Sequence, residues 1–309
     1  MKNMLITGGT TFVSRYAAQY FADKYQVFVL NRKTRPQCGG VTLIEGDRHA
    51  LGNRLRGLHF DAVLDITAYT AADVSDLLDA LDSFDEYLLI SSSAVYPETA
   101  PQPFTEETPT GPNQIWGAYG TDKIAAEQTL LARVPDAYIL RPPYLYGPGN
   151  NVYREAFVFD CAMQGRPFCL PGDGGMKLQF FHVEDLCRFM DVILEAHPRQ
   201  RIFNVGNRDT VTVKEWVEAC YEALGKRPEF RNIPAYVEQR KYFPFYNYGY
   251  CLDVKKQFEY LFDTKPLPEG LRECFAWYLE HPDMVKKKPL LEYMDQKYLF
   301  SRSPIPSDK

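Results

Sequence analysis

The chain has 309 residues, and its 35 Lys and Arg residues against 40 Asp and Glu residues leave a net charge of −5. A hydrophobic share of 45% with 24% charged residues is the balance of a globular protein, which excludes disorder as its main state. The pI near 5.7 gives no net positive field for a phosphate backbone, so nucleic acid is not the expected partner. No apolar run reaches the roughly 18 residues of a membrane span, and no cleavable signal pattern follows Met1, so we expect a cytoplasmic protein.

Cysteine and histidine usage gives no sign of a disulfide framework or a metal site. The seven cysteines are odd in number and form no C-x-x-C pair, which argues against disulfide scaffolds and zinc ribbons. The five histidines are scattered, and no two stand at the spacing of ligands on one helix face. The sequence therefore predicts no metal.

Short apolar runs alternate with amphipathic stretches through the first half of the chain. Helical periodicity of three to four residues is found at 12–25, 71–81 and 118–133. Such alternation predicts an α/β fold, with a doubly wound parallel sheet covered by helices on both faces. The expected strands, each followed by turn residues, are 4–7, 27–30, 41–44, 62–66, 87–90 and 138–140.

This rhythm breaks after Arg141-Pro142-Pro143. Residues 144–175 carry several Gly and Pro turns around one expected helix. A strand at 201–205 and a helix at 213–224 follow, and an aromatic-rich stretch ends near residue 250. We expect one domain made mainly of residues 1–165, with return segments near 180–206. Residues 166–309 should form mainly a smaller C-terminal, substrate-binding lobe that shares a cleft with it.

A glycine turn joins the first expected strand to the first expected helix. Its sequence is Gly8-Gly9-Thr10-Thr11-Phe12-Val13. Such a turn lets the main chain approach a pyrophosphate, while the helix N-terminus supplies free N–H groups. Glycine at every third position would fall on residues 11 and 14, where this chain has Thr11 and Ser14. The turn favours a dinucleotide-binding domain, and a tight turn without a ligand is the alternative.

The next strand ends without the acid that often binds the ribose 2′-hydroxyl of NAD. Asn31 and Arg32 stand there, and a guanidinium matches a 2′-phosphate well. A solvated basic turn is an equally weighted alternative. Asp47, after the third strand, could reach the adenine or could simply cap a turn. The expected cofactor is NAD or NADP, with a slight preference for NADP.

Serines at the end of the fifth strand and a Tyr-x-x-x-Lys pair carry the catalytic hypothesis. Tyr119 and Lys123 follow Ser92 by 27 and 31 residues, and i, i+4 spacing puts them on one helical face. A nearby cation favours the phenolate, so such a tyrosine can act as a base near neutrality. The same spacing occurs at Tyr20 and Lys24, where surface residues are the simpler interpretation.

With these motifs the chain resembles the extended short-chain dehydrogenase/reductases, and in particular the NAD-dependent epimerase/dehydratase family, whose core is a Rossmann fold. The resemblance covers nearly the whole chain. It extends to Leu140-Arg141-Pro142-Pro143, Phe180-Phe181-His182-Val183, Phe203-Asn204-Val205-Gly206 and the expected last helix from Gly270.

The resemblance implies the roles of individual residues. Ser92, with Ser93 as the fallback, would hold the developing oxygen, and Tyr119 would remove a hydroxyl proton while hydride passes to the nicotinamide. Lys123 would contact the nicotinamide ribose. The cofactor-binding set it implies is Gly8, Gly9, Thr10, Thr11, Phe12, Val13, Asn31, Arg32, Asp47, Thr67, Ala68, Lys123 and Arg141.

Two departures from the family pattern bear on the substrate. Ser93-Ala94 stands where a sugar 4,6-dehydratase would carry Asp-Glu, and Leu178-Gln179 replaces an Arg-Asp pair whose arginine often holds a nucleotide diphosphate. The expected function is a nicotinamide-dependent epimerase or reductase, an isomerase or oxidoreductase, acting on a sugar or nucleotide sugar. The alternative is a non-catalytic or RNA-associated binding protein on the same fold.

The family resemblance also implies a possible homodimer. Residues 71–81 and 118–133 match the helices that commonly pair with their copies. Val74, Leu77, Leu78 and Leu81 are candidates for a second apolar stripe. The alternative is that these side chains belong entirely to the core against the sheet.

Overall fold

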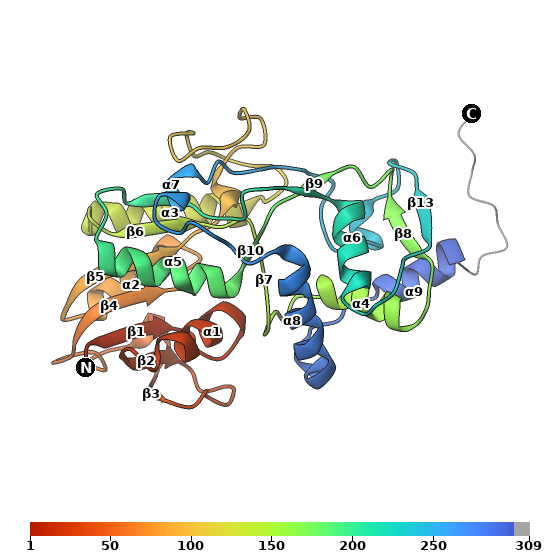
Figure 1. Ribbon diagram of the computed structural model, residues 1–309. Helices are drawn as coiled ribbons and strands as arrows, with labels where there is room; N and C mark the ends of the chain where they lie inside the picture. Colours follow the sequence, from red (N-terminus) through yellow and green to blue (C-terminus); the bar gives the residue numbers. More distant parts are fainter. Residues whose placement is uncertain (300–309) are drawn as a thin grey trace. The chain divides into compact units, whose positions relative to one another are not determined.

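The computed structural model describes residues 1–299 (Figure 1). They divide into two compact units, and each is described by itself. The first unit comprises Met1–Gly149, Phe180–Arg208 and Cys251–Thr264, and the second comprises Asn150–Gln179, Asp209–Tyr250 and the chain from Lys265 onward. That these units are the expected dinucleotide-binding domain and substrate-binding lobe stays a prediction.

The first unit is built on a seven-stranded sheet of order β11-β6-β5-β4-β1-β2-β3, in which every pair is parallel. This confirms the doubly wound α/β fold. Its strands are β1 (Asn3–Thr7), β2 (Gln26–Asn31), β3 (Val41–Glu45), β4 (His59–Asp65), β5 (Ser83–Ile90), β6 (Tyr138–Arg141) and β11 (Ile202–Asn204).

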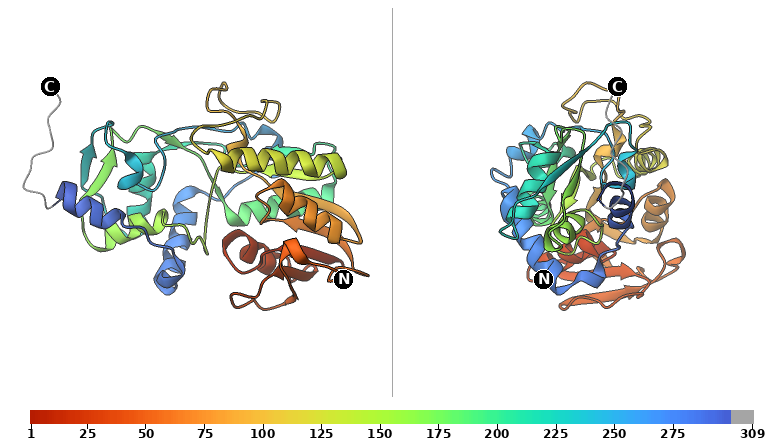
Figure 2. Two further views of the ribbon diagram at one scale, coloured as in Figure 1. Left: turned by 180° about the vertical axis from the view of Figure 1, so that it is seen from behind. Right: turned by 90° about the vertical axis from the view of Figure 1, so that its right-hand side faces the viewer.

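Apolar side chains on both faces of this sheet explain why helices cover it on both sides. Helices α1 (Phe12–Phe21) and α5 (Val183–Ala196) pack against one face, where Ala17, Phe21 and Met190 are fully buried. Helices α2 (Ala71–Ala80) and α3 (Ala118–Arg133) pack against the other, through residues such as Leu77 and Leu130. Figures 1 and 2 show these two helix layers from opposite sides.

Strand order reverses at β1, which pairs with β2 on one side and with β4 on the other. Crevices beside the carboxyl ends of strands at such a reversal are where α/β sheets bind ligands. The segments that follow β1, β4 and β5 lie at these carboxyl ends, and they contain most of the predicted site residues.

Within the described residues, the second unit contains four α-helices and two small two-stranded sheets. Strand β8 (Phe168–Pro171) pairs in parallel with β13 (Phe230–Ile233), and β9 (Lys177–Leu178) pairs antiparallel with β12 (Val211–Thr212). The helices that pack together are α4 (Glu155–Met163), α6 (Val213–Glu222) and α8 (Leu267–Glu280). Helix α9 (Leu290–Met294) also belongs to the second unit. The strands β7 (Tyr144–Tyr146) and β10 (Phe180–His182) and the helix α7 (Lys255–Phe258) belong to the first unit.

Two observations bear on assembly and on membranes. Val74, Leu77, Leu78 and Leu81 are all at least nine-tenths buried in the core of this chain, so they form no second apolar stripe on α2. Among the described residues, no helix is long and apolar enough to cross a membrane.

Candidate functional site

The turn between β1 and α1 requires glycine at two consecutive positions. Gly8 and Gly9 have φ angles of 95° and 88°, a region that side chains disfavour. A Cβ on Gly8 would lie 2.7 Å from the Ser14 Oγ, and one on Gly9 would lie 2.6 Å from a Val29 methyl carbon. Only glycine lets the main chain follow this path so close to β2 and α1.

Helix α1 begins without a side-chain cap. Thr11 occupies the N-cap position but accepts no hydrogen bond there, and the Ser14 hydroxyl instead donates to the Thr11 carbonyl oxygen at 3.0 Å. The first N–H groups of the helix are thus left for another acceptor. A glycine cradle next to an uncapped helix N-terminus fits a pyrophosphate. The cofactor contacts predicted for residues 8–13 agree with this geometry and stay predictions.

Asn31 has an internal role at the end of β2. Its side-chain amide donates to the Gly8 carbonyl oxygen at 2.6 Å and to the Gln37 side chain at 2.9 Å, so it braces the glycine turn. Arg32 beside it is exposed. Asp47 accepts a hydrogen bond from the His49 main chain at 3.0 Å and caps the short helix η1 (Arg48–Ala50).

Lys123 is the most unusual of the predicted catalytic residues because its ammonium is almost completely buried. Only 3% of the residue is exposed. Its Nζ donates to the main-chain oxygen of Ala68 at 2.6 Å and to that of Ile90 at 2.8 Å, so it ties together the segments after β4 and β5. Burial lowers the pKa of Lys123 to about 8, although nearby carboxylates oppose this shift.

Tyr119 lies one turn before Lys123 on α3, and Tyr69 lies beside both. The Tyr69 ring centroid is 5.0 Å from the Lys123 Nζ and 6.3 Å from the centroid of the Tyr119 ring. Both rings are partly exposed, with 55% of Tyr69 and 40% of Tyr119 open to solvent. A phenol that a substrate can reach and a buried cation are thus brought together on one face of the helix.

Ser92 stands at the carboxyl end of β5, partly exposed, and its Oγ accepts a hydrogen bond from the Ala94 main chain at 3.1 Å. Gly120 brings α3 against this segment. A Cβ on Gly120 would lie 2.5 Å from the Ala94 carbonyl oxygen. This glycine was missed in the sequence, although its position between Tyr119 and Lys123 was the available signal.

Arg141 has an internal partner that the sequence did not predict. Its guanidinium donates to both Glu127 carboxylate oxygens, at 3.0 and 2.5 Å, and to the Tyr96 hydroxyl at 2.9 Å. Glu127 also accepts from the Ser91 hydroxyl. Arg141 and Glu127 are both at least 95% buried. The structure thus uses Arg141 to join β6 to α3, and its predicted cofactor contact stays a prediction.

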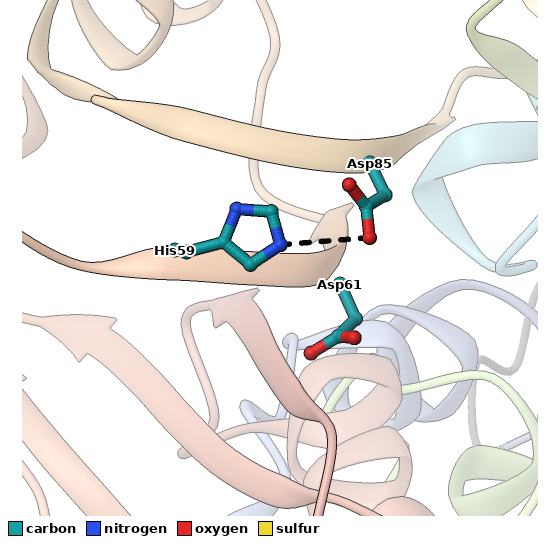
Figure 3. Close-up of side chains that lie close together, drawn as sticks. All are labelled: His59, Asp61 and Asp85. Atoms are coloured by element: carbon teal, nitrogen blue, oxygen red, sulfur yellow. Dashed lines mark ion pairs between the residues drawn. The ribbon is translucent and has the colours of Figure 1, made fainter.

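A separate cluster of possible metal ligands lies where β4 and β5 begin. Figure 3 shows His59, Asp61 and Asp85 with their polar atoms gathered, and the His59 Nε2 is 3.5 Å from an Asp85 carboxylate oxygen. His59 and Asp85 are exposed. They lie near the amino ends of β4 and β5, whereas Lys123 contacts the chain at the carboxyl ends of these strands. The absence of a metal from this protein therefore stays a prediction.

Comparison with known proteins gives the site its context. The family described as "NAD dependent epimerase/dehydratase family" matches residues 4–206. The matched region begins in β1 and ends just after β11, so it contains the whole parallel sheet and every predicted site residue.

Individual relatives are more distant. The chain is 28% identical over 301 residues to a chloroplast stem-loop binding protein of 41 kDa from Arabidopsis thaliana, covering 89% of this chain and 78% of that protein. It is 29% identical over 219 residues to a probable GDP-L-fucose synthase from Oryza sativa subsp. japonica, covering 65% and 64% of the two. A dTDP-glucose 4,6-dehydratase from Bacillus anthracis, solved in complex with NAD, has a TM-score of 0.73 at 20% identity, over 94% of this chain and 100% of that one. At that identity the structural match shows the fold.

Proposed function

The chain belongs to the NAD dependent epimerase/dehydratase family and is an enzyme of the extended short-chain dehydrogenase/reductase type; on that premise we propose that it is an epimerase or reductase of a sugar or nucleotide sugar. One observation carries the proposal. The Lys123 ammonium is buried between the ends of β4 and β5, with the accessible phenol of Tyr119 one turn away. Burying a cation costs free energy, and a role for the Lys123 charge beside the Tyr119 phenol would account for that cost.

In the proposed mechanism Tyr119 is the general base. Its phenolate removes the proton from a substrate hydroxyl, and the Ser92 hydroxyl donates a hydrogen bond to the oxygen on which charge develops. The Lys123 charge favours the phenolate form of a neighbouring phenol. A nicotinamide cofactor held at this site would supply the hydride chemistry at the carbon that bears this hydroxyl.

The cofactor would be held by the turn of Gly8 and Gly9 and by the uncapped start of α1, with Lys123 at its nicotinamide end. Asn31 is engaged with Gly8, so it offers little to a ribose hydroxyl, whereas the exposed Arg32 can pair with a 2′-phosphate. We therefore propose that NADP binds at least as well as NAD. Titrating both cofactors against the wild type and Arg32→Ala tests this. Strong NAD preference together with unchanged NADP affinity in Arg32→Ala would assign Arg32 to a solvated turn.

The substrate class rests on relatives. A rice relative is named a probable GDP-L-fucose synthase, and a relative from Streptomyces kanamyceticus is named a 2′-dehydrokanamycin reductase. The decisive experiment adds a panel of sugar nucleotides and free sugars to the cofactor-loaded protein and follows the nicotinamide absorbance. A transient or lasting change that requires Tyr119 supports the proposal, and no response to any member rejects it.

An RNA-associated role is the second candidate, because a relative whose length is covered to 78% by the match is named a stem-loop binding protein. The net charge of −5 argues against it. Retention of a stem-loop RNA at about 50 mM salt that disappears near 200 mM would support this role. Retention by the wild type together with a silent substrate panel would replace the enzymatic proposal.

We also propose that the protein acts in the cytoplasm and forms a homodimer through α2 and α3. With the leucines of α2 buried, the apolar residues left for that contact are few, such as the partly exposed Ile124 and Ala125. Light scattering at micromolar concentration tests the dimer. A mass near 35.6 kDa at every concentration would reject it.

A further inference from the structure

Strand β4 ends in an acid that is completely buried. Asp65 has 0% exposure and follows the buried residues Ala62, Val63 and Leu64. A buried carboxylate costs free energy unless it is paired and hydrogen-bonded. The function described above assigns Asp65 no role, so its burial needs an explanation.

Three side chains hold the Asp65 carboxylate. The Arg48 Nη2 donates to both oxygens, at 2.9 and 3.0 Å, and the Tyr87 hydroxyl donates at 2.7 Å. The Thr7 hydroxyl donates the fourth hydrogen bond, at 2.8 Å. Burial, followed by the negative charge of Asp65, raises the pKa of Tyr87, so this phenol stays a donor. Arg48, Tyr87 and Thr7 come from three different elements, η1, β5 and β1.

Thr7 connects the Asp65 carboxylate to the main chain after β4 by hydrogen bonds. Its Oγ accepts hydrogen bonds from the N–H groups of Ile66 and Thr67, at 2.9 and 3.0 Å. One residue further along the chain, the Ala68 carbonyl oxygen accepts the 2.6 Å hydrogen bond from the Lys123 Nζ. An unbroken chain of hydrogen bonds and peptide units thus leads from Asp65 to Lys123.

Asp65 also acts on Lys123 through its charge. Burial is the largest influence on the pKa of Lys123 and lowers it, and the negative charge of Asp65 is the largest opposing influence. Arg48 acts in the opposite sense to Asp65. The charged and titratable groups that face Lys123 from the surrounding elements are Arg48, Asp65, Tyr69, Asp73, Tyr119 and Glu127.

We infer that Asp65 is a positioning residue for Lys123: supported by Arg48 and relayed by Thr7, it fixes the segment of residues 66–68 and places a negative charge near the Lys123 ammonium. The inference deepens the proposed function, because it gives that site the group that maintains its cation. Asp65 itself touches no reacting atom. It acts only through Lys123 and the Ala68 carbonyl.

A merely structural role for Asp65 makes a different prediction, and the sign of one measurement separates the two. Loss of a structural carboxylate would loosen the site and admit water, which would move the pKa of Lys123 up toward its usual value near 10.5. Loss of a charge that sustains the ammonium would move the pKa down. Removing the Arg48 charge while Asp65 remains should move it up.

The experiment measures the Lys123 titration directly. Protein labelled with ¹³C at the lysine Cε is titrated by NMR, and the Lys123 signal is assigned by its loss in Lys123→Arg. In Asp65→Asn we expect the midpoint to fall by about one pH unit or more, and in Arg48→Met we expect it to rise. Tyr87→Phe, which removes one hydrogen bond but keeps the carboxylate, is the matched control and should leave the midpoint within about 0.3 units.

The double variant Arg48→Met with Asp65→Asn guards against misfolding, because it removes the buried guanidinium that loses its main carboxylate partner in Asp65→Asn. If Asp65→Asn alone does not fold, the midpoint of the double variant is compared with that of Arg48→Met, and a fall supports the inference. A midpoint that rises or does not move when Asp65 loses its charge overturns it.

Thr7 provides an independent check of the relay. Thr7→Val removes the hydroxyl at nearly constant volume, whereas Thr7→Ser keeps it. Faster amide exchange at Ile66 and Thr67 in Thr7→Val, with wild-type exchange in Thr7→Ser, is the expected result. Equal exchange in both variants would overturn the relay. Neither measurement needs a substrate, so failure of the proposed function and failure of this inference remain distinguishable.

Discussion

The first unit contains the same Tyr-x-x-x-Lys spacing in two places, at Tyr20 and Lys24 around the end of α1, and at Tyr119 and Lys123 on α3. The surroundings differ in almost every respect. The side chain of Lys24 is 45% exposed and forms an ion pair with the Asp191 carboxylate, whereas Lys123 is 3% exposed and bonded to main-chain oxygens. The spacing alone therefore carries no chemistry.

The electrostatic consequences of these surroundings have opposite signs. The hydrogen bond to Asp191 raises the pKa of Lys24, and burial, with help from Asp191, raises the pKa of Tyr20. That tyrosine is held in its neutral form. Burial lowers the pKa of Lys123 to about 8, so the pKa of this ammonium lies close to physiological pH. The Asp191 carboxylate contributes to the raised pKa values of the first pair, whereas the Lys123 ammonium of the second pair bonds to main-chain oxygens.

The largest contrast is expected in turnover. Tyr119→Phe keeps the ring but removes the ionisable oxygen, so turnover should fall by at least the roughly 10²-fold typical of losing a general base. Cofactor affinity should barely change. The matched variant Tyr20→Phe should turn over substrate like the wild type, because its phenol serves only local contacts with Asp191. Steady-state kinetics on any accepted substrate make the measurement. Near-normal turnover in Tyr119→Phe would remove the distinction between the two pairs.

A smaller contrast is expected in the pH dependence of stability. Because the folded-state pKa of Lys123 lies below the unfolded value, the unfolded chain binds more protons between about pH 8 and pH 10.5. The contribution of Lys123 therefore becomes more favourable as the pH rises through this window, by about 2 kcal/mol up to pH 10. The pKa of Lys24 is raised, so its contribution should instead be lost above its own, higher pKa.

Urea unfolding of the wild type, Lys123→Met and Lys24→Met at about pH 7 and pH 10 measures these terms as differences between variants. The free energy of unfolding of Lys123→Met minus that of the wild type should decrease as the pH rises. A difference that is the same at both pH values would mean that Lys123 has an ordinary pKa, and the contrast between the two lysines would then rest on turnover alone.

The sheet was largely predictable because its strands are short apolar runs separated by amphipathic helices. Six strands and three helices of the first half were expected close to their observed bounds, although α1 ends at Phe21 rather than Tyr25. Helix α5 was missed, since Val183–Ala196 had been considered only as part of a motif. The short strands β7 to β10, β12 and β13 were missed as well, because two to four residues carry no measurable periodicity.

Within the site, the sequence indicated which residues come together but not what holds them. Glu127 and Arg141 looked like an ordinary helix residue and a cofactor ligand, and their buried pairing depends on the approach of α3 to β6. For the helix at 71–81 the sequence offered a second apolar stripe or core residues, and the leucines proved to be core residues. Asp65 within an apolar strand was a visible signal, since an acid at such a position needs partners from elsewhere in the chain.

The smallest expected effect concerns the close packing of α3 against the segment after β5. This packing distinguishes the surroundings of Lys123 from those of Lys24. Gly120→Ala places a Cβ 2.5 Å from the Ala94 carbonyl oxygen, a main-chain atom that cannot move aside easily. Overpacking of this kind should destabilise the protein by about 1 to 2 kcal/mol and push Tyr119 away from Ser92. Gly39→Ala is the matched control, because nothing lies within 4 Å of the added carbon. Urea unfolding should show the loss only for Gly120→Ala, and turnover should fall with it. If both alanine variants behave alike, the close approach of α3 to the end of β5 is not what fixes the positions of Tyr119 and Lys123.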